Sequence, residues 1–246
     1  MRNYQFSILN LNIMKPILYI VLFTFLVSCN PKLSSGLRKN DLKRDVEMVT
    51  SMGTMVIRLS DSTPLHRDNF LKLVKQHYYD SILFHRVINH FMIQAGDPES
   101  KRAEAGKQLG NGGPDYTIPA EFRPTIFHKK GVIAAARTGD DVNPQKASSG
   151  SQFYIVQGRV FTDVSLDSVE TYRLKGRKLP IEHRAAYKTI GGTPHLDKGY
   201  TVFGELVSGT EVLDSIAAVP TSGRQGGDRP LKDVRIISAR LIKRNK

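Results

Sequence analysis

The 246-residue sequence has no tryptophan and a single cysteine, Cys29, which excludes an intramolecular disulfide. Its apolar stretch at residues 16–27 is about 12 residues long, whereas a membrane-spanning helix needs about 20. The lysines and arginines form no single run and do not alternate with aromatic residues as they do in nucleic-acid-binding modules. These absences argue against a disulfide-linked scaffold, a spanning helix at residues 16–27 and binding of nucleic acid.

Sequence signatures of several catalytic classes are also missing. The seven histidines show no H-E-x-x-H spacing, so no zinc-protease site is predicted. The GNGG cluster at residues 110–113 is not followed by G-K-[ST] and is typical of a turn, not of a phosphate-binding loop. The serines of residues 148–151 lie in no G-x-S-x-G elbow. We therefore expect no metal, no cofactor and no serine nucleophile.

What the chain does contain is typical of a globular protein. Hydrophobic residues make up 40% of the sequence and charged residues 24%, which suits one domain of moderate size with a leader. The formal net charge is +13, and such a balance favours either a basic, soluble surface or contact with an anionic membrane. Because the basic residues are scattered, we favour the first interpretation.

The sequence around Cys29 is typical of a bacterial lipoprotein. The apolar stretch 16–27 has the length of a signal-peptide core, and the LVSC sequence that ends at Cys29 resembles the bacterial lipobox. We predict that residues 1–28 are a signal peptide that is removed and that Cys29 is lipidated. Met14 would serve as the start of this leader as well as Met1. A buried cysteine at the end of a hydrophobic helix is the alternative.

A tether and then a hairpin are predicted next. Residues 29–45 are polar, with proline, glycine and serine, and suit a linker between a lipid anchor and a folded domain that starts near Val46. The runs VEMVT and TMVIRLS flank a turn at residues 51–53 and predict a β-hairpin.

A mainly β fold with few helices is predicted for the domain. Thr63 is placed to cap a helix that has Pro64 in its first turn. The predicted buried face of this helix consists of Phe70, Leu73, Val74 and His77. A second helix fits residues 210–218, and the remaining segments are short strand-like runs separated by glycine and proline. This rhythm predicts a closed antiparallel β-barrel.

Two polar stretches interrupt the short strands. Residues 138–149 are rich in turn formers and predict an exposed loop. Residues 162–192 are densely charged, and the spacing of Leu166 and Val169 indicates a short helix there. We predict a partly helical surface insert.

Two segments resemble the signature segments of the cyclophilins: FHRVINHFMIQAGD at residues 84–97 and GSQFYI at residues 150–155. Further likenesses are TPLHRDNFLKLV to the first helix of that family, GVIAAAR to a barrel strand and HLDKGYTVFGELVSG to its closing strand. The resemblance extends over residues 46–242. It implies an eight-stranded closed barrel capped by two helices, and peptidyl-prolyl cis-trans isomerase activity.

The chemistry of that reaction fits the residues present. Rotation about an X-Pro bond crosses a barrier of about 18–20 kcal/mol that amide resonance sets, and no covalent bond changes. The enzyme therefore needs only to favour the twisted amide over the planar one. In the twisted amide the proline nitrogen gains a lone pair, which a fixed donor can stabilise. The resemblance implies that this donor is Arg86, whose guanidinium is always charged.

The resemblance also implies a substrate-binding set around Arg86. Its members are Phe91, Met92, Gln94, Ala136, Gln152, Tyr154, His195, Leu196 and Tyr200. In the SQFYI run, period-2 alternation puts Gln152 and Tyr154 on one face of a strand and Phe153 on the other. Without the resemblance, Phe91 and Met92 would be interpreted as ordinary core residues.

The chain departs from the family pattern at the rim of the predicted site. Tyr154 stands where many relatives have Phe, and Arg137 where animal cyclophilins have Asn. His195 stands where many eukaryotic relatives have Trp, and Tyr200 where they have His. These changes keep the predicted isomerase activity and put the details of the substrate rim in doubt.

We therefore expect a monomeric isomerase that is anchored by lipid in the bacterial cell envelope, faces the periplasm and acts on X-Pro bonds of exported, unfolded or flexible polypeptides. Two alternatives remain. One is a non-catalytic module that binds proline peptides through the same groove. The other is a scaffold role in the envelope that is carried by residues 162–192.

Overall fold

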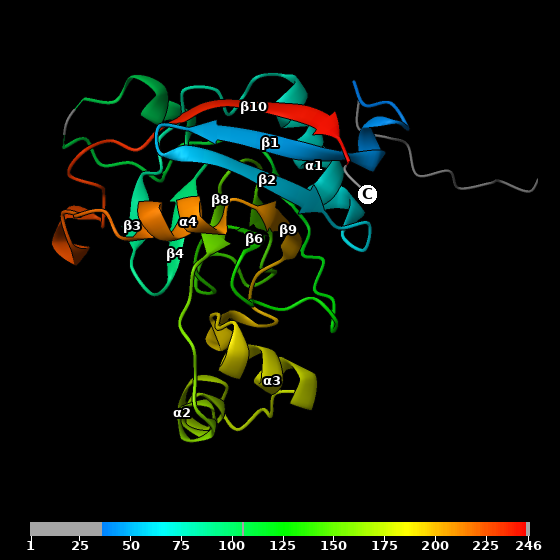
Figure 1. Ribbon diagram of the computed structural model, residues 1–246, viewed down its shortest axis with the longest axis vertical. Coiled ribbons are helices and arrows are strands. Elements are labelled where there is room, and N and C mark those ends of the chain that lie inside the picture. Colours follow the sequence, from blue (N-terminus) through cyan, green and yellow to red (C-terminus); the bar gives the residue numbers. More distant parts are fainter. Residues whose placement is uncertain (1–35, 105, 245–246) are drawn as a thin grey trace, which may run out of the picture. The chain divides into compact units, whose positions relative to one another are not determined.

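The computed structural model describes residues 36–104 and 106–244 (Figure 1). The predicted signal peptide and Cys29 lie outside these residues. A short 3-10 helix, Asp41–Lys43, and the first strand, β1, which begins at Arg44, show that ordered structure starts before Val46. None of the helices within the described residues has the length and apolar character of a membrane span.

An eight-stranded antiparallel sheet dominates the fold, in the order β10-β1-β2-β9-β6-β8-β4-β3. Its strands are β1 (Arg44–Thr50), β2 (Gly53–Leu59), β3 (Arg86–Ile88), β4 (Met92–Ala95), β6 (Val132–Ala135), β8 (Phe153–Val156), β9 (Val202–Ser208) and β10 (Ile236–Lys243). Two short strands, β5 (Thr117–Ile118) and β7 (Ser148–Ser149), pair separately. The predicted hairpin is confirmed, because β1 and β2 pair from Val46 with Ile57 to Thr50 with Gly53.

The sheet curls into a half-barrel and does not close (Figure 1), so the predicted closed barrel is wrong in this respect. The three-residue strand β3 forms one end of the sheet and β10 the other. Between them lies a single isolated bridge, from Leu83 to Arg235. Residues 223–233, which precede that bridge, contain three glycines and Pro230. Pro230 has no backbone N–H to donate and so interrupts the ladder, although the Asp228 carbonyl accepts from Val87 N–H of β3.

Among the described residues are four α-helices, of which two pack into the main core. These are α1 (Pro64–Lys75) and α4 (Thr210–Ala217). Thr63 occupies the predicted N-cap position of α1, but its side chain makes no capping hydrogen bond. Glu121 takes this role, accepting hydrogen bonds from the backbone N–H groups of Leu65 and His66. His77 lies beyond the end of α1 with an exposed side chain, so it is not part of the buried face.

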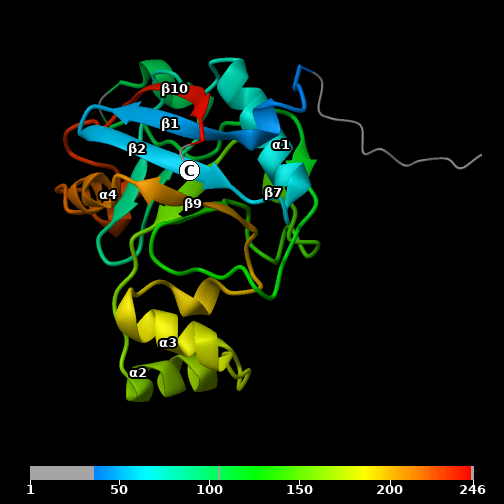
Figure 2. The same cartoon turned by 45° about the vertical axis from the view of Figure 1, so that its right-hand side comes forward.

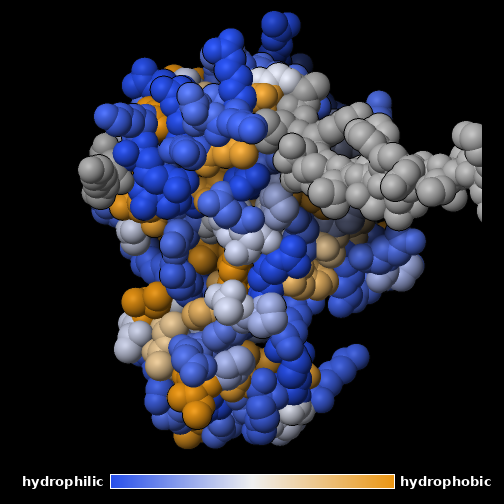
Figure 3. Space-filling model, turned by 90° about the vertical axis from the view of Figure 1, so that its right-hand side faces the viewer, coloured by the Kyte–Doolittle hydropathy of each residue, from blue (hydrophilic) through white to orange (hydrophobic). Residues whose placement is uncertain are grey.

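The other two helices lie in the stretch 162–192 (Figure 2). They are α2 (Asp163–Ser168), continued by a π-helical turn at Val169–Arg173, and α3 (Ile181–Thr189). They enclose a small apolar core of their own, made of Phe161, Leu166, Leu174, Leu179 and Tyr187. The face of the molecule in Figure 3 is mainly hydrophilic, with apolar side chains gathered in its lower part, where Figures 1 and 2 place these helices.

The central strands β4, β6 and β8 are buried on both faces. One face carries Ile93, Ile133 and Phe153 into the main core beneath α1 and α4. The opposite face carries Met92, Ala134 and Tyr154 into a second apolar cluster that also contains Ala136, Val202 and Leu196. Because successive side chains on a strand point to opposite faces, every second residue of these strands is directed toward the second cluster. The candidate site is built on it.

Candidate active site

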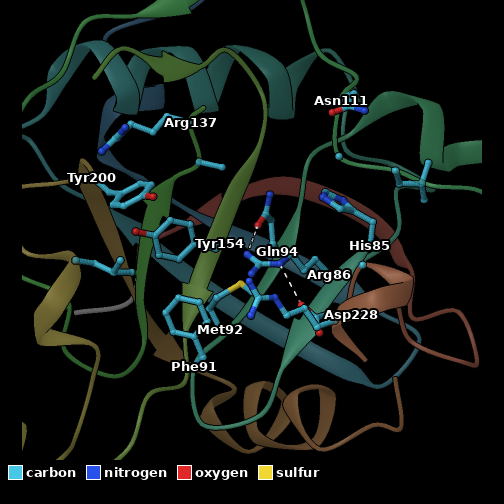
Figure 4. A pocket seen from close by; sticks show the side chains of 16 residues that line it. His85, Arg86, Phe91, Met92, Gln94, Asn111, Arg137, Tyr154, Tyr200 and Asp228 are labelled. Atoms are coloured by element: carbon cyan, nitrogen blue, oxygen red, sulfur yellow. Dashed lines mark hydrogen bonds and ion pairs between the residues drawn. The ribbon is translucent and has the colours of Figure 1, made fainter. Parts of the chain in front are cut away.

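A cavity of about 460 Å³ opens over the second apolar cluster (Figure 4). Eight of the predicted site residues line it: Arg86, Phe91, Met92, Gln94, Ala136, Tyr154, Leu196 and Tyr200. They come from β3, from β4 and the residue before it, from β8, and from positions 136, 196 and 200, which are far apart in the sequence. The fold therefore brings most of the predicted set into one pocket.

Arg86 stands at one side of this pocket, with 40% of its side chain exposed. Its Nη1 donates to Gln94 Oε1 over 3.5 Å, across the β3–β4 pair in which these residues are direct neighbours. Its Nε lies 3.5 Å from Asp228 Oδ2. Within residues 36–104 and 106–244 the guanidinium makes no other hydrogen bond or ion pair. The remaining donors of its fork are therefore available to a ligand.

The wall beside Arg86 is apolar. Met92 and Tyr154 are almost completely buried, and Phe91 and Leu196 pack against them while partly exposed. The rings of Tyr154 and Tyr200 meet edge to face, with centroids 5.8 Å apart. A small apolar ring such as that of proline can be buried against this wall, with the charged guanidinium of Arg86 beside it.

Two glutamines connect the pocket to the loop 110–112. Gln94 Nε2 donates to Gln152 Oε1 over 3.1 Å, and Gln152 Nε2 donates to the carbonyl oxygens of Gly110 and Gly112 over 2.8 Å each. Gln152 does not line the 460 Å³ cavity and instead borders a neighbouring groove of about 570 Å³. Its position orients Gln94, which in turn contacts Arg86.

Comparisons with known proteins agree with this geometry. The family model described as cyclophilin type peptidyl-prolyl cis-trans isomerase/CLD matches residues 45–241. A Staphylococcus haemolyticus protein named for peptidyl-prolyl cis-trans isomerase activity is 36% identical over 209 residues, covering 85% of this chain and 95% of its own length. The chain belongs to the cyclophilin family.

Other similar proteins extend the comparison. A Streptococcus pyogenes protein named as a bifunctional phosphatase and peptidyl-prolyl cis-trans isomerase is 39% identical over 192 residues, covering 77% of this chain and 37% of its own. A solved cyclophilin of Cryptosporidium parvum has a TM-score of 0.59 at 22% identity, covering 82% of this chain and 99% of its own. That likeness shows the cyclophilin fold, and the enzyme class of the family is peptidyl-prolyl cis-trans isomerase (EC 5.2.1.8).

In this cyclophilin, His195 is the other predicted residue that does not line the cavity. It lies in the 3-10 turn Pro194–Leu196 and stacks on Phe91, with ring centroids 5.6 Å apart. Burial lowers the pKa of His195 to about 4, and the positive charge of Arg173 acts in the same direction. The structure therefore places His195 against Phe91, outside the lining of the cavity.

Eight lining residues were not in the predicted set: His85, Leu109, Gly110, Asn111, Arg137, Arg224, Gly227 and Asp228. Asp228 follows the glycine-rich run at residues 223–227, and its own φ is 57°. Its backbone carbonyl accepts from Val87 N–H over 2.9 Å, which fixes the loop against β3. A carboxylate at the end of a glycine-rich stretch is a weak signal, and only the fold shows that it reaches Arg86.

His85 and Arg137 also have roles that their sequence positions do not reveal. Burial lowers the pKa of His85 to about 4, and in the described part of the chain neither ring nitrogen has a hydrogen-bond partner. The Arg137 guanidinium lies 4.5 Å from the centre of the Tyr200 ring. It also donates to the Gly199 carbonyl and pairs with Asp140. Arg137 therefore fixes the rim of the pocket with its side chain.

Proposed function

We propose that this cyclophilin isomerises X-Pro bonds of exported polypeptides, with Arg86 donating to the proline nitrogen of the twisted amide. The observation that carries the proposal is the placement of a half-exposed guanidinium with free donors beside the apolar wall of Phe91, Met92 and Tyr154. The proline ring binds this wall while the preceding residue turns. No titration of Arg86 is needed, because its charge is permanent.

Differential binding explains why such a site accelerates rotation. In the planar amide the nitrogen lone pair is delocalised, so a donor gains little from it. In the twisted amide the lone pair is localised and accepts a charge-assisted hydrogen bond, worth about 1.5–3 kcal/mol. At about 1.4 kcal/mol per tenfold in rate, this one contact supplies roughly 10- to 100-fold. Gln94 and Asp228 supply the orientation, since each contacts the guanidinium from one side.

Arg86→Ala tests the mechanism. We expect kcat/KM for a proline peptide to fall by about 10- to 100-fold, while peptide affinity measured by calorimetry changes little. Arg86→Lys should recover little activity, because an ammonium lacks the planar fork. Arg240→Ala, which removes an exposed arginine of β10, is the matched control. Near-normal turnover of Arg86→Ala defeats the mechanism, and a wild-type protein that binds the peptide without accelerating rotation supports the non-catalytic alternative.

The location is part of the same proposal. The signal-peptide core at residues 16–27 and the LVSC sequence at Cys29 support a lipid-anchored envelope protein. Mass spectrometry of the membrane fraction should find a mature chain that starts at a lipidated Cys29. An unmodified Cys29 in a chain that keeps residues 1–28 would overturn this part of the proposal and leave the isomerase mechanism intact.

A further inference from the structure

A buried chain of hydrogen bonds runs behind the apolar wall of the pocket. The Tyr154 ring lines the cavity, and its hydroxyl lies 2.9 Å from His128 Nε2. His128 Nδ1 lies 3.0 Å from Asp197 Oδ1, and the His128 backbone N–H donates to the same oxygen over 2.9 Å. All three residues are buried, with at most 7% of their surface exposed. The wall of the pocket is therefore tied to a carboxylate that lies deeper in the protein.

The direction of each hydrogen bond follows from the charges. Burial favours the neutral acid of Asp197, but the hydrogen bonds from His128 outweigh it and hold the pKa of this carboxyl well below its usual range. An ionised carboxylate can only accept, so His128 Nδ1 carries a hydrogen, and in the neutral imidazole Nε2 is then the acceptor. Burial raises the pKa of Tyr154, so its hydroxyl keeps the hydrogen that it donates to Nε2.

The second oxygen of Asp197 is bound from the stretch 162–192. Tyr187 of α3 donates its hydroxyl to Asp197 Oδ2 over 2.8 Å, and His183 Nδ1 of the same helix lies 3.8 Å from that oxygen. Arg177 Nη2 donates to the Asp197 backbone carbonyl over 2.8 Å. Tyr187 is fully buried. Three residues of the insert therefore contact Asp197, two of them at the carboxylate that orients His128.

We propose that Tyr187, Asp197 and His128 are positioning residues for the isomerase, through which the insert at 162–192 fixes the Tyr154 wall of the proline pocket. The inference rests on the proposed function, since it concerns the same pocket. A phenyl ring alone would provide the apolar wall, whereas a buried hydroxyl is unfavourable unless it is hydrogen-bonded. The Tyr154 hydroxyl is therefore useful for its connection to His128, and the insert completes that connection.

The consequence for catalysis is geometric. Without the Tyr187 hydroxyl, Asp197 Oδ2 loses its closest donor and the carboxylate is held mainly through Oδ1, which allows it to rotate. His128 then loses its fixed acceptor, and the Tyr154 ring loses the partner that fixes its hydroxyl end. Small displacements of a group that positions the reacting atoms reduce the rate. An insert outside the sheet would in this way influence turnover without contacting substrate.

Removing single hydroxyls tests this connection. We expect Tyr187→Phe to lower kcat/KM for a proline peptide about three- to tenfold, with most of the change in kcat. Tyr154→Phe should have a similar effect. The double variant should be no worse than the stronger single variant, because both changes interrupt one chain. Tyr172→Phe, which removes an exposed hydroxyl of the same insert, is the matched control and should behave as wild type. Wild-type turnover of Tyr187→Phe, or strictly additive losses in the double variant, overturns the inference.

A spectroscopic measurement on the full chain does not depend on activity. Nitrogen-15 NMR of the wild type should show His128 with hydrogen on Nδ1 and a bare Nε2, and Asp197→Asn should weaken that preference. Hydrogen on Nε2 in the wild type contradicts the direction of the chain, even if Tyr187→Phe does not fold. If the wild type is active, Arg86→Ala is inactive and Tyr187→Phe has wild-type turnover, this inference is overturned and the proposed function stands. Absence of isomerase activity, with the expected His128 tautomer present, instead overturns the proposed function.

Discussion

Two buried histidines of this cyclophilin occupy almost the same hydrogen-bonded setting. His66 Nδ1 lies 2.7 Å from Glu121 Oε2 and its Nε2 lies 2.9 Å from Ser148 Oγ. His128 bridges Asp197 and Tyr154 in the same order of carboxylate, imidazole and hydroxyl. The two differ in what surrounds the hydroxyl end. The void beside His66 has a volume of about 10 Å³, whereas Tyr154 borders the cavity of 460 Å³.

That difference separates structural from functional use of the same groups. A Ser-His-carboxylate order is also that of hydrolase triads, but the space beside His66 is too small for any substrate and barely admits a water molecule. Glu121 instead satisfies backbone N–H groups at the start of α1, so this cluster stabilises the fold. The His128 cluster has the same chemistry, and its contact with the pocket wall gives it a role in the site.

The largest expected effect comes from breaking the structural cluster. Glu121→Ala leaves His66 and two backbone donors without their acceptor, and each buried donor left unsatisfied costs about 1–3 kcal/mol. Urea unfolding should show this loss of stability, while kcat/KM of the folded fraction at low temperature should match wild type. Glu104→Ala, at an exposed glutamate, is the control. A marked loss of turnover with unchanged stability would erase the distinction between the two clusters.

The sequence could predict the elements whose signals are local. Period-2 alternation placed Tyr154 and Phe153 on opposite faces of β8, and the structure confirms it by burying them in different clusters. The structure also brings Arg86 and Gln94, both of the signature segment 84–97, together on paired strands. Such predictions succeed because neighbours in sequence share a strand or a tight hairpin.

Contacts between distant segments could not be predicted in the same way. Glu121 replaces Thr63 as the acceptor for α1 from 55 or more positions away, and Asp228 reaches Arg86 from the far end of the chain. The closure of the barrel likewise depends on how residues 223–233 meet β3. None of these contacts leaves a periodic pattern, because each depends on the tertiary arrangement of loops.

A third buried histidine, His85, sharpens the comparison because its ring has neither a carboxylate nor a hydroxyl partner within residues 36–104 and 106–244. Its pKa is lowered by burial from 6.5 to about 4, so the folded state binds this proton less readily than the unfolded chain. His85 therefore does not lower the free energy of unfolding above pH 6.5. As the pH falls below 6.5, the free energy of unfolding decreases, by about 3 kcal/mol at pH 4. Turnover should stay flat between about pH 6 and 8, since His85 does not titrate there.

His85→Gln should remove most of this acid-dependent loss. The measurement is urea unfolding at pH 7, 5 and 4, and His77→Asn, at an exposed histidine, is the control. An unchanged pH dependence in His85→Gln would mean that His85 gains a partner that lowers the cost of its charge.

Excision of the insert tests whether the His128 cluster depends on it. Residues 163–190 would be replaced by a short Gly-Ser link that keeps Gly191 and Gly192, since the Gly192 backbone bridges to both Lys129 and Arg159. The domain should still fold, because the entropy cost of closing a surface loop changes only slowly with the length of the loop. Exposure of Phe127, which packs on the small core of the insert, should cost about 2 kcal/mol.

The two clusters should respond differently to that excision. Turnover should fall about as far as in Tyr187→Phe, because Asp197 loses the same donor, while the environment of His66 stays unchanged in NMR spectra. Full turnover of the shortened chain would show that Asp197 needs no help from the insert. Loss of the fold would show that α3 is part of the main core.

The smallest expected effect concerns a carboxylate that contacts the site from the solvent side. Asp228 is partly exposed and lies 3.5 Å from Arg86 Nε, unlike the buried Asp197. Partly exposed ion pairs are worth about 0.2–1 kcal/mol, which corresponds to at most about fivefold in rate. Asp228→Asn should therefore lower kcat two- to fivefold and leave KM nearly unchanged. Asparagine tolerates the positive φ of this position, so the loop and its backbone bond to Val87 should persist.

Ionic strength separates the charge of Asp228 from the shape of its loop. Screening weakens an exposed pair, because the Debye length falls from about 10 Å at 0.1 M salt to about 3 Å at 1 M. Raising the salt should slow the wild type toward the Asp228→Asn rate. Tyr187→Phe, whose defect lies in a buried hydrogen bond, should slow in parallel, so that its fold deficit relative to the wild type is the same at low and high salt. A salt-independent gap between wild type and Asp228→Asn would instead mean that Asp228 acts through the conformation of residues 223–228, and Arg86 would then be oriented mainly by Gln94.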